Sequence, residues 1–190
     1  MKKEKWLAFT PFLFLFLTPS CHWLDTSELV ISSVPYVSDG DVKFYRRFEP
    51  EHGGIDLSAT RQIPIRAACD GKFSKELYYH PTSLRWQVNC DIKVGSYVLE
   101  CFFEPGSQVS EETGRAQFDA LVADGTQVHA GDMLGTLLLA PGNDIAILHF
   151  GVRRGSEFEC PLGYCSDEVK VQLQALANRD HPGWEPCAGN

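Results

Sequence analysis

Two short segments place imidazole and carboxylate groups where they could share one metal ion. The segment His-Gly-Gly-Ile-Asp puts His52 and Asp56 four residues apart. The flexible glycines between them let the chain turn, so that both side chains can reach one ion. The second segment, the apolar run 145–152, contains His149. A lone histidine in a strand is more often a structural residue than a ligand, so His149 acquires meaning only together with His52 and Asp56.

The period of a β-strand predicts the direction in which His149 points. Side chains alternate between the two faces of a strand, so His149 shares a face with Ile147 and Gly151. The opposite face carries Leu148 and Phe150 and is apolar, which suits a hydrophobic core. We therefore predict that His149 points away from the core and toward a site.

Short strands are the elements that must position these residues. Strand-favouring stretches bounded by Gly, Pro, Asp and Asn predict a mainly β fold, a small antiparallel sheet domain with a groove. A short C-terminal helix is also predicted, because Ser166 can cap it and Leu173 and Leu176 lie on one apolar face. A second short helix is expected near 116–122, within an acidic connection. The predicted strands are 42–48, 63–68, 71–79, 85–92, 97–103, 133–139 and 145–152.

The N-terminus has the pattern of an export signal. A basic start is followed by the apolar run 6–17, which is shorter than a membrane-spanning helix and has the length of a signal segment. A buried N-terminal helix is the alternative, but the run lacks a polar face. The sequence around Cys21 resembles a bacterial lipoprotein signal, in which a cysteine after small residues is lipidated. Ordinary cleavage near Ser20 is the alternative to a lipid anchor.

The cysteine count fits an exported domain. The chain has seven cysteines, and six remain when Cys21 is set aside. An even number in an exported domain predicts three disulfides. If Gly95-Ser96 is a two-residue hairpin turn, Cys90 and Cys101 lie directly opposite each other, which suggests one pairing and leaves the other four open. The six disulfide candidates are Cys69, Cys90, Cys101, Cys160, Cys165 and Cys187.

The charge of the chain argues against nucleic acid as a partner. The formal net charge is −8, and removal of residues 1–20, with three lysines and one glutamate, takes it to −10. An acidic surface repels phosphate backbones and offers no basic patch to anionic lipid. Membrane association would therefore depend on acyl chains at Cys21. The sequence also lacks a Gly-x-Ser-x-Gly nucleophile motif, a phosphate-binding loop and a dinucleotide fingerprint.

Four segments in order resemble the lysostaphin-type (LytM-like) zinc peptidases. Their family pattern is His-x-Gly-Ile-Asp, then Gly-x-Pro-Val-x-Ala-x-x-Asp-Gly-x-Val, then Val-x-x-Gly-x-x-Leu-Gly and finally His-Leu-His-Phe. Residues 52–57, 62–73, 128–135 and 147–150 follow this order and together span about residues 50–153. The resemblance implies that His52, Asp56 and His149 bind one zinc ion. Such a three-ligand set leaves a position open for water or substrate. It also implies peptide cross-links of peptidoglycan as the substrate class.

Two positions depart from the family pattern. The first histidine of the last motif is a catalytic residue that does not bind the metal, and Ile147 takes its place here. A second catalytic histidine usually follows the central hairpin, where this chain has Glu104. A glutamate beside an open zinc site is the general base of other zinc peptidases, whereas the alternative is a solvated carboxylate at the rim. An alkyl side chain such as Ile147 can neither donate nor accept a proton.

The sequence therefore predicts four parts and two main functions. The parts are a signal peptide (1–20), a tether (21–41), a LytM-like peptidase domain (42–158) and a disulfide-stapled helical cap (159–190). One function is a zinc endopeptidase of the cell envelope with weak or altered activity on peptidoglycan. The other is an inactive scaffold that binds cell wall or regulates a partner hydrolase. An envelope lipoprotein whose site binds nothing is a third hypothesis, which the retained ligand set disfavours.

Overall fold

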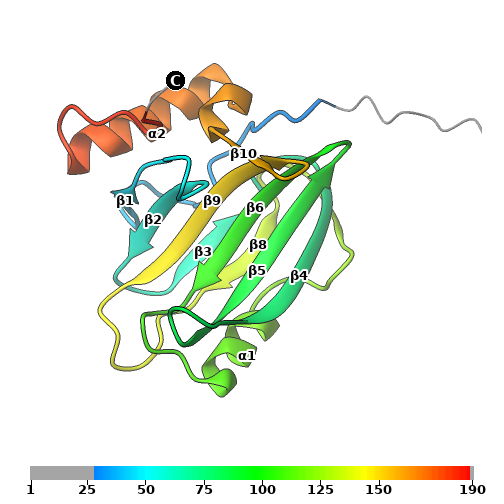
Figure 1. Ribbon diagram of the computed structural model, residues 1–190, viewed down its shortest axis with the longest axis vertical. Coiled ribbons are helices and arrows are strands. Elements are labelled where there is room, and N and C mark those ends of the chain that lie inside the picture. Colours follow the sequence, from blue (N-terminus) through cyan, green and yellow to red (C-terminus); the bar gives the residue numbers. More distant parts are fainter. Residues whose placement is uncertain (1–27, 189–190) are drawn as a thin grey trace, which may run out of the picture.

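The computed structural model describes residues 28–188, whose strands form one large and one small antiparallel sheet (Figure 1). The large sheet has the order β1-β2-β9-β6-β5-β4-β7, with β10 paired to β9, and the small sheet pairs β3 with β8. The predicted antiparallel β fold with a C-terminal helix is confirmed. The strands are β1 (Lys43–Arg46), β2 (Ile55–Ala59), β3 (Ile63–Arg66), β4 (Gly71–His80), β5 (Arg85–Val94), β6 (Tyr97–Glu104), β7 (Gln127–Val128), β8 (Met133–Leu137), β9 (Ala146–Arg154) and β10 (Glu157–Glu159). The helices are α1 (Glu111–Asp119), η1 (Pro161–Tyr164) and α2 (Asp167–Asp180).

The two faces of the large sheet have different chemistry. On β9, Leu148, Phe150 and Val152 are fully buried and pack in the core, as the alternation predicted. The small sheet lies behind this face in Figure 1, and its own apolar residues belong to the same core cluster. The other face of β9 carries Ile147 and His149, which line an open groove. The sheet therefore separates one hydrophobic core from one polar surface.

Strand β2 was not among the predicted strands. Its five residues are all buried, although their sequence Ile-Asp-Leu-Ser-Ala alternates apolar and polar side chains. It pairs with β1 on one side and with β9 on the other, and it carries Asp56. Five residues that follow a pair of glycines are close to the lower limit of strand length, and the segment was assigned only to the metal-binding motif, which is why β2 was not predicted.

The hairpin between β5 and β6 turns where the sequence predicted. Val94 pairs with Tyr97 across the two-residue turn, and Gly95 has φ of 55°. Such a left-handed conformation is favourable only for glycine and a few polar residues. The turn fixes the register of β5 and β6, so that Cys90 lies opposite Cys101.

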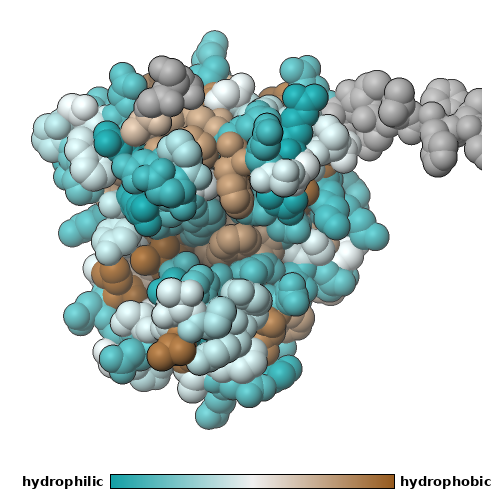
Figure 2. Space-filling view, viewed as in Figure 1, coloured by the Kyte–Doolittle hydropathy of each residue, from teal (hydrophilic) through white to brown (hydrophobic). Residues whose placement is uncertain are grey.

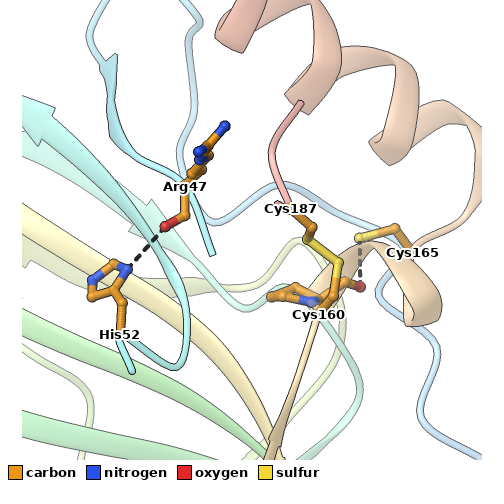
Figure 3. Close-up of a disulfide and its surroundings, with 6 residues drawn as sticks. Arg47, His52, Cys160, Cys165 and Cys187 are labelled. Atoms are coloured by element: carbon orange, nitrogen blue, oxygen red, sulfur yellow. Dashed lines mark hydrogen bonds between the residues drawn. A yellow bond between two sulfur atoms is a disulfide. The ribbon is translucent and has the colours of Figure 1, made fainter. Parts of the chain in front are cut away.

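The predicted Cys90–Cys101 disulfide and the total of three disulfides are corrected by the structure. Among residues 28–188, the disulfide joins Cys160 to Cys187 (Figure 3), whereas Cys69, Cys90, Cys101 and Cys165 are buried and free. Side chains of opposed strand residues project side by side from the sheet. A disulfide needs the two Cβ–S bonds turned about 90° to each other, so register alone does not create the bond.

Helix α2 begins and packs as predicted. The Ser166 hydroxyl accepts a hydrogen bond from Val169 N–H at 3.4 Å, which satisfies one of the free amides of the first turn. Leu173 and Leu176 are buried. Near its end, the Asp180 carboxylate accepts from Phe44 N–H of β1 at 2.7 Å. The helix is thereby tied to the edge strand of the large sheet.

Helix α1 differs from the expected 116–122. It starts at Ser110, whose hydroxyl accepts from Thr113 N–H at 3.3 Å, and it ends at Asp119. The cap and the acidic residues of the first turn stabilise a start earlier than the apolar residues alone suggest.

The N-terminal predictions lie partly outside the described residues. The signal peptide 1–20 and Cys21 belong to that part of the chain. Of the predicted tether 21–41, the structure packs Leu29, Ile31 and Tyr36 into the core. Among residues 28–188, no helix is long and apolar enough to cross a membrane.

Replacing Leu173 with alanine tests the packing of α2 on the domain. Its side chain is fully buried, so Leu173→Ala should lower the free energy of unfolding by about 2–5 kcal/mol. Val171→Ala is the matched control, because that side chain is 68% exposed on the same helix and should change stability by less than about 0.5 kcal/mol. Chemical denaturation measures both. Equal effects of the two variants would contradict the packing of α2 described here.

Candidate metal centre

Two neighbouring strands and one turn bring His52, Asp56 and His149 together. Asp56 on β2 is the register partner of His149 on β9, so both side chains leave the sheet on the same face. His52 enters from the turn before β2, where its N–H donates to Glu49 O at 2.9 Å. Gly53 follows with φ of 76°, a conformation that lets the chain reverse toward the strand. The structure thus brings together all three residues predicted to bind metal.

The Asp56 carboxylate bridges the two histidines. One oxygen lies 2.9 Å from His52 Nε2 and the other lies 2.9 Å from His149 Nδ1. One ligand atom from each residue can be chosen so that all three lie within 4.8 Å of one another. All three residues are largely buried, with His149 7% and Asp56 9% exposed. A charged carboxylate so far from water requires partners of this kind.

The other nitrogen of His52 fixes the role of Nε2. His52 Nδ1 lies 3.1 Å from the carbonyl oxygen of Arg47 (Figure 3), and a carbonyl only accepts, so Nδ1–H must donate. In a neutral ring Nε2 then carries a lone pair and faces Asp56, which is also an acceptor. A proton or a metal ion must stand between these two atoms. A backbone partner on the second ring nitrogen is the usual support of a metal-binding histidine.

The pKa shifts of Asp56 and His52 favour a positive charge between them. Burial raises the pKa of Asp56, but the hydrogen bonds from His149 and His52 outweigh it and lower this pKa to about 2. Burial lowers the pKa of His52, yet its bond to Asp56 outweighs that effect, and the pKa lies above its usual 6.5. The carboxylate therefore stays ionised and attracts a proton or a cation to its partners.

Aromatic and glycine residues hold the His149 ring in place. Phe102 on β6 stacks on it, with ring centres 5.1 Å apart and planes 16° apart. The His52 ring meets it edge-on at 5.1 Å. A Cβ added at Gly54 would lie 2.5 Å from the His149 ring, which is closer than any real contact. Only glycine fits beside this imidazole.

These residues fit a zinc ion. Two imidazole nitrogens and one carboxylate oxygen are a ligand set that zinc uses, and three protein ligands leave a coordination position free. The observation that supports the fit is that Nε2 of a neutral His52 and the Asp56 carboxylate, which are both acceptors, face each other at 2.9 Å. Without a metal, the same three residues would form a hydrogen-bonded triad with a protonated His52.

An open groove lies over the three candidate ligands. It encloses about 590 Å³, and Figure 2 shows the molecule hollowed across the face that carries β9, β6 and β5 in Figure 1. Residues from β2, β4, β5, β6 and β9 line its floor, and the exposed side chains of Tyr45 and Phe158 stand at its border. A peptide-sized ligand therefore has access to the metal-ligand triad.

The two positions that depart from the family pattern also line this groove. Ile147 and Glu104 are register partners on β9 and β6. Glu104 is ion-paired with Arg85 of β5. Burial raises the pKa of Glu104, and the neighbouring guanidinium of Arg85 opposes this rise. Glu104 is therefore a mostly buried, paired carboxylate rather than a solvated one at the rim.

Arg85 is the residue of this site that the sequence analysis missed. It lies at the start of β5, where a lone arginine carries no sequence signal of its own. The register of β4, β5 and β6 brings it beside Glu104, which is 19 residues away in sequence. The remaining histidines are placed simply: His80 lines the groove, and the side chain of His129 is 72% exposed.

Comparisons with known proteins give structural similarity only. No family model and no curated protein matches the chain. The chain is similar to a zinc-containing peptidase from Vibrio cholerae, with 17% identity, a TM-score of 0.46 and coverage of 70% of this chain and 39% of that one. It is similar to a mutant catalytic domain of the prophage-encoded M23 protein EnpA from Enterococcus faecalis, with 19% identity, a TM-score of 0.43 and coverage of 69% and 96%. It is also similar to lysostaphin, with 17% identity, a TM-score of 0.44 and coverage of 83% of this chain and 58% of that one.

One of these similar structures is described as a zinc-containing peptidase and another as an M23 protein. The chain spans less than two thirds of the Vibrio cholerae protein and of lysostaphin. All three TM-scores are below 0.5, so these similarities add no argument about the site of this chain.

Zinc content tests the metal centre directly. The purified protein should bind about one zinc per chain, and His149→Ala should lose it, because one of three ligands is removed. His129→Ala is the matched control, since that histidine is exposed and distant from the triad in the sheet. Metal analysis after dialysis measures all three proteins. Equal zinc in the His149 and His129 variants would rule out the predicted ligand set.

A glycine substitution tests the shape of the centre without removing a ligand. Gly54→Ala should weaken zinc binding by about tenfold or more, because its Cβ would displace the His149 ring. Gly163→Ala serves as the comparison, since nothing lies within 4 Å of the added Cβ there. Competition with a chromogenic chelator gives both affinities. Wild-type affinity in Gly54→Ala would show that the close contact does not constrain the site.

Proposed function

We propose that this chain is a cell-envelope domain of the lysostaphin (LytM-like) type that binds one zinc ion and acts on peptide cross-links of peptidoglycan. The observation that carries the proposal is the Asp56 carboxylate held between His52 and His149 on the floor of an open groove. The order of the four sequence motifs supports the same class. The proposed activity is a weak or altered endopeptidase.

The residues of the chain would orient both the ion and the substrate. When bound, zinc would polarise a peptide carbonyl and lower the pKa of a bound water. Arg47 holds His52 through its carbonyl, so that Nε2 faces the Asp56 carboxylate, where the ion would bind. Phe102 covers the His149 ring and limits access of bulk water on that side. An extended peptide could lie along the groove with its cleaved bond above the triad.

Proton transfer is the weak part of this site. Ile147 offers no proton, and Glu104 is bound by Arg85. To act as a base, Glu104 would have to leave or share that ion pair. Each acid–base group typically contributes about 10²–10⁴-fold to a rate, so the activity should be low. This is the reason for proposing a weak or altered endopeptidase.

The Arg85–Glu104 pair favours a second candidate function. An inactive scaffold that binds cell wall, or that regulates a partner hydrolase, needs the groove and not the proton transfer. The ion pair places two mutually bound charged side chains in the groove, where an active enzyme would have a catalytic group. In either function, export and a lipid anchor at Cys21 would keep the domain at the membrane surface.

Restoring a histidine tests the enzyme proposal. We expect slow cleavage of a cross-linked stem peptide by the zinc-loaded protein, and loss of that cleavage on treatment with chelator. Ile147→His should raise the rate by about 10²-fold, because it supplies a group that can exchange a proton. Ile147→Asn is the control for polarity without proton exchange. Mass spectrometry of the products measures the rates.

The same assay examines Glu104. Glu104→Gln should reduce any cleavage by about tenfold or more if this carboxylate is the base. Unchanged cleavage in Glu104→Gln would remove it from the mechanism. Absence of cleavage in the wild type and in Ile147→His, with zinc bound in both, would favour the scaffold.

A further inference from the structure

A second polar cluster lies on the groove face beside the metal-ligand triad. Glu100 of β6 precedes Phe102 by two residues and therefore projects from the same face. Its register partners are Asp91 on β5 and Gly151 on β9. Two residues along a strand span about 6.6 Å. The cluster therefore lies two residues along the strands from the register pair of Phe102 and His149.

One oxygen of Glu100 is buried without a partner. The side chain lines the groove and is 7% exposed. Its Oε1 accepts from Arg153 Nε at 2.6 Å, whereas its Oε2 has no hydrogen-bond partner. A buried acceptor left unpaired is costly and rare. An N–H group from a ligand would satisfy this oxygen.

Glu100 has a second carboxylate, that of Asp91, as its register partner. The carboxylates of Asp91 and Glu76 lie on the neighbouring strands and act on one another electrostatically, and the cations near Asp91 are Arg153 and Lys93. Arg153 is already bound to Glu100 and to the carbonyl of Gly155. The two adjacent carboxylates of Glu100 and Asp91 would therefore be stabilised by a further positive charge.

Space for a ligand continues from the groove to this cluster. A second hollow of about 250 Å³ lies beside the first, and Asn89 borders both. Asp91, Glu76, Ser74 and Lys75 line it as well. The Lys75 ammonium group is bound to the carbonyls of Phe118 and Leu121. A flexible side chain that enters from the main groove could place its end group there.

We propose that Glu100 and Asp91 form a subsite for an ammonium group of the bound peptide. An ammonium carries three N–H donors and one positive charge, which matches an unpaired carboxylate oxygen with a second carboxylate beside it. A neutral amide would satisfy the oxygen and leave the charge unbalanced. The proposal rests on the proposed function, because it assumes a peptide in the groove.

The geometry limits where the amine lies in the substrate. An extended peptide advances about 3.3–3.6 Å per residue, and the subsite is about 6.6 Å along the strands from the row of His149. The amine therefore belongs to a residue within about two positions of the bond above the metal. The domain should prefer cross-links with a free amine at that distance.

Two matched peptides test the subsite. The probe is a synthetic stem-type peptide with both ends capped and one lysine. The comparison peptide carries the same lysine acetylated on Nε, which removes the charge and keeps the chain. Isothermal titration calorimetry with the zinc-loaded protein should give about tenfold tighter binding of the free amine, as expected for a hydrogen bond between charged groups.

Three variants assign the preference to these carboxylates. Glu100→Gln should reduce the tenfold difference to about twofold or less. Asp91→Asn should reduce it as well, and it leaves the Arg153–Glu100 bond in place, so it answers the case in which Glu100→Gln fails to fold. Glu157→Gln, an exposed glutamate outside the groove, should keep the full difference.

The outcomes separate the subsite from the proposed function. Equal binding of both peptides by the zinc-loaded wild type would overturn the subsite and leave the peptide-binding function intact. A preference that survives in both Glu100→Gln and Asp91→Asn would overturn it too. If zinc binds and neither peptide does, peptide binding in this groove is wrong, and the subsite falls with it.

Discussion

The site depends on one buried carboxylate that two imidazoles share. Asp56 is ionised because His149 and His52 hold its two oxygens, and their hydrogen bonds outweigh the cost of burial. Its position is set by β2, whose apolar residues on either side, Ile55 and Leu57, are fully buried. A shift of this strand would separate Asp56 from both histidines at once. The packing of β2 in the sheet therefore also sets the geometry of the metal centre.

The groove combines an intact ligand set with altered proton-transfer positions. On one side of His149 lie Ile147, Glu104 and its ion-pair partner Arg85. On the other side lies Glu100, with an oxygen that has no partner. Because the ligand triad needs only β2, β9 and the turn before β2, the neighbouring strands can change their chemistry without disturbing it. Such a division suits a domain whose binding and cleavage properties differ from those of an efficient enzyme.

The sequence predicted those features that depend on local spacing. Alternation along β9 gave the direction of His149, and the Gly95 turn gave the register that places Cys90 opposite Cys101. It did not indicate β2, because this alternating stretch has only five residues and follows a pair of glycines. It also missed Arg85, whose partner lies on another strand, and it left the pairing of Cys160 with Cys187 open among the disulfide candidates. Contacts between distant segments depend on how the sheet is assembled, which residue types and spacing do not specify.

Crystallography of the zinc-soaked protein, with anomalous data at the zinc edge, tests the central claim most directly. We predict one anomalous peak about 2.0–2.2 Å from His52 Nε2, from an oxygen of Asp56 and from His149 Nδ1, with the His52–Arg47 hydrogen bond retained. A structure without such a peak, in which Asp56 still bridges both histidines at zinc concentrations that load known sites, would contradict it. The three residues would then be a hydrogen-bonded triad and not a metal centre.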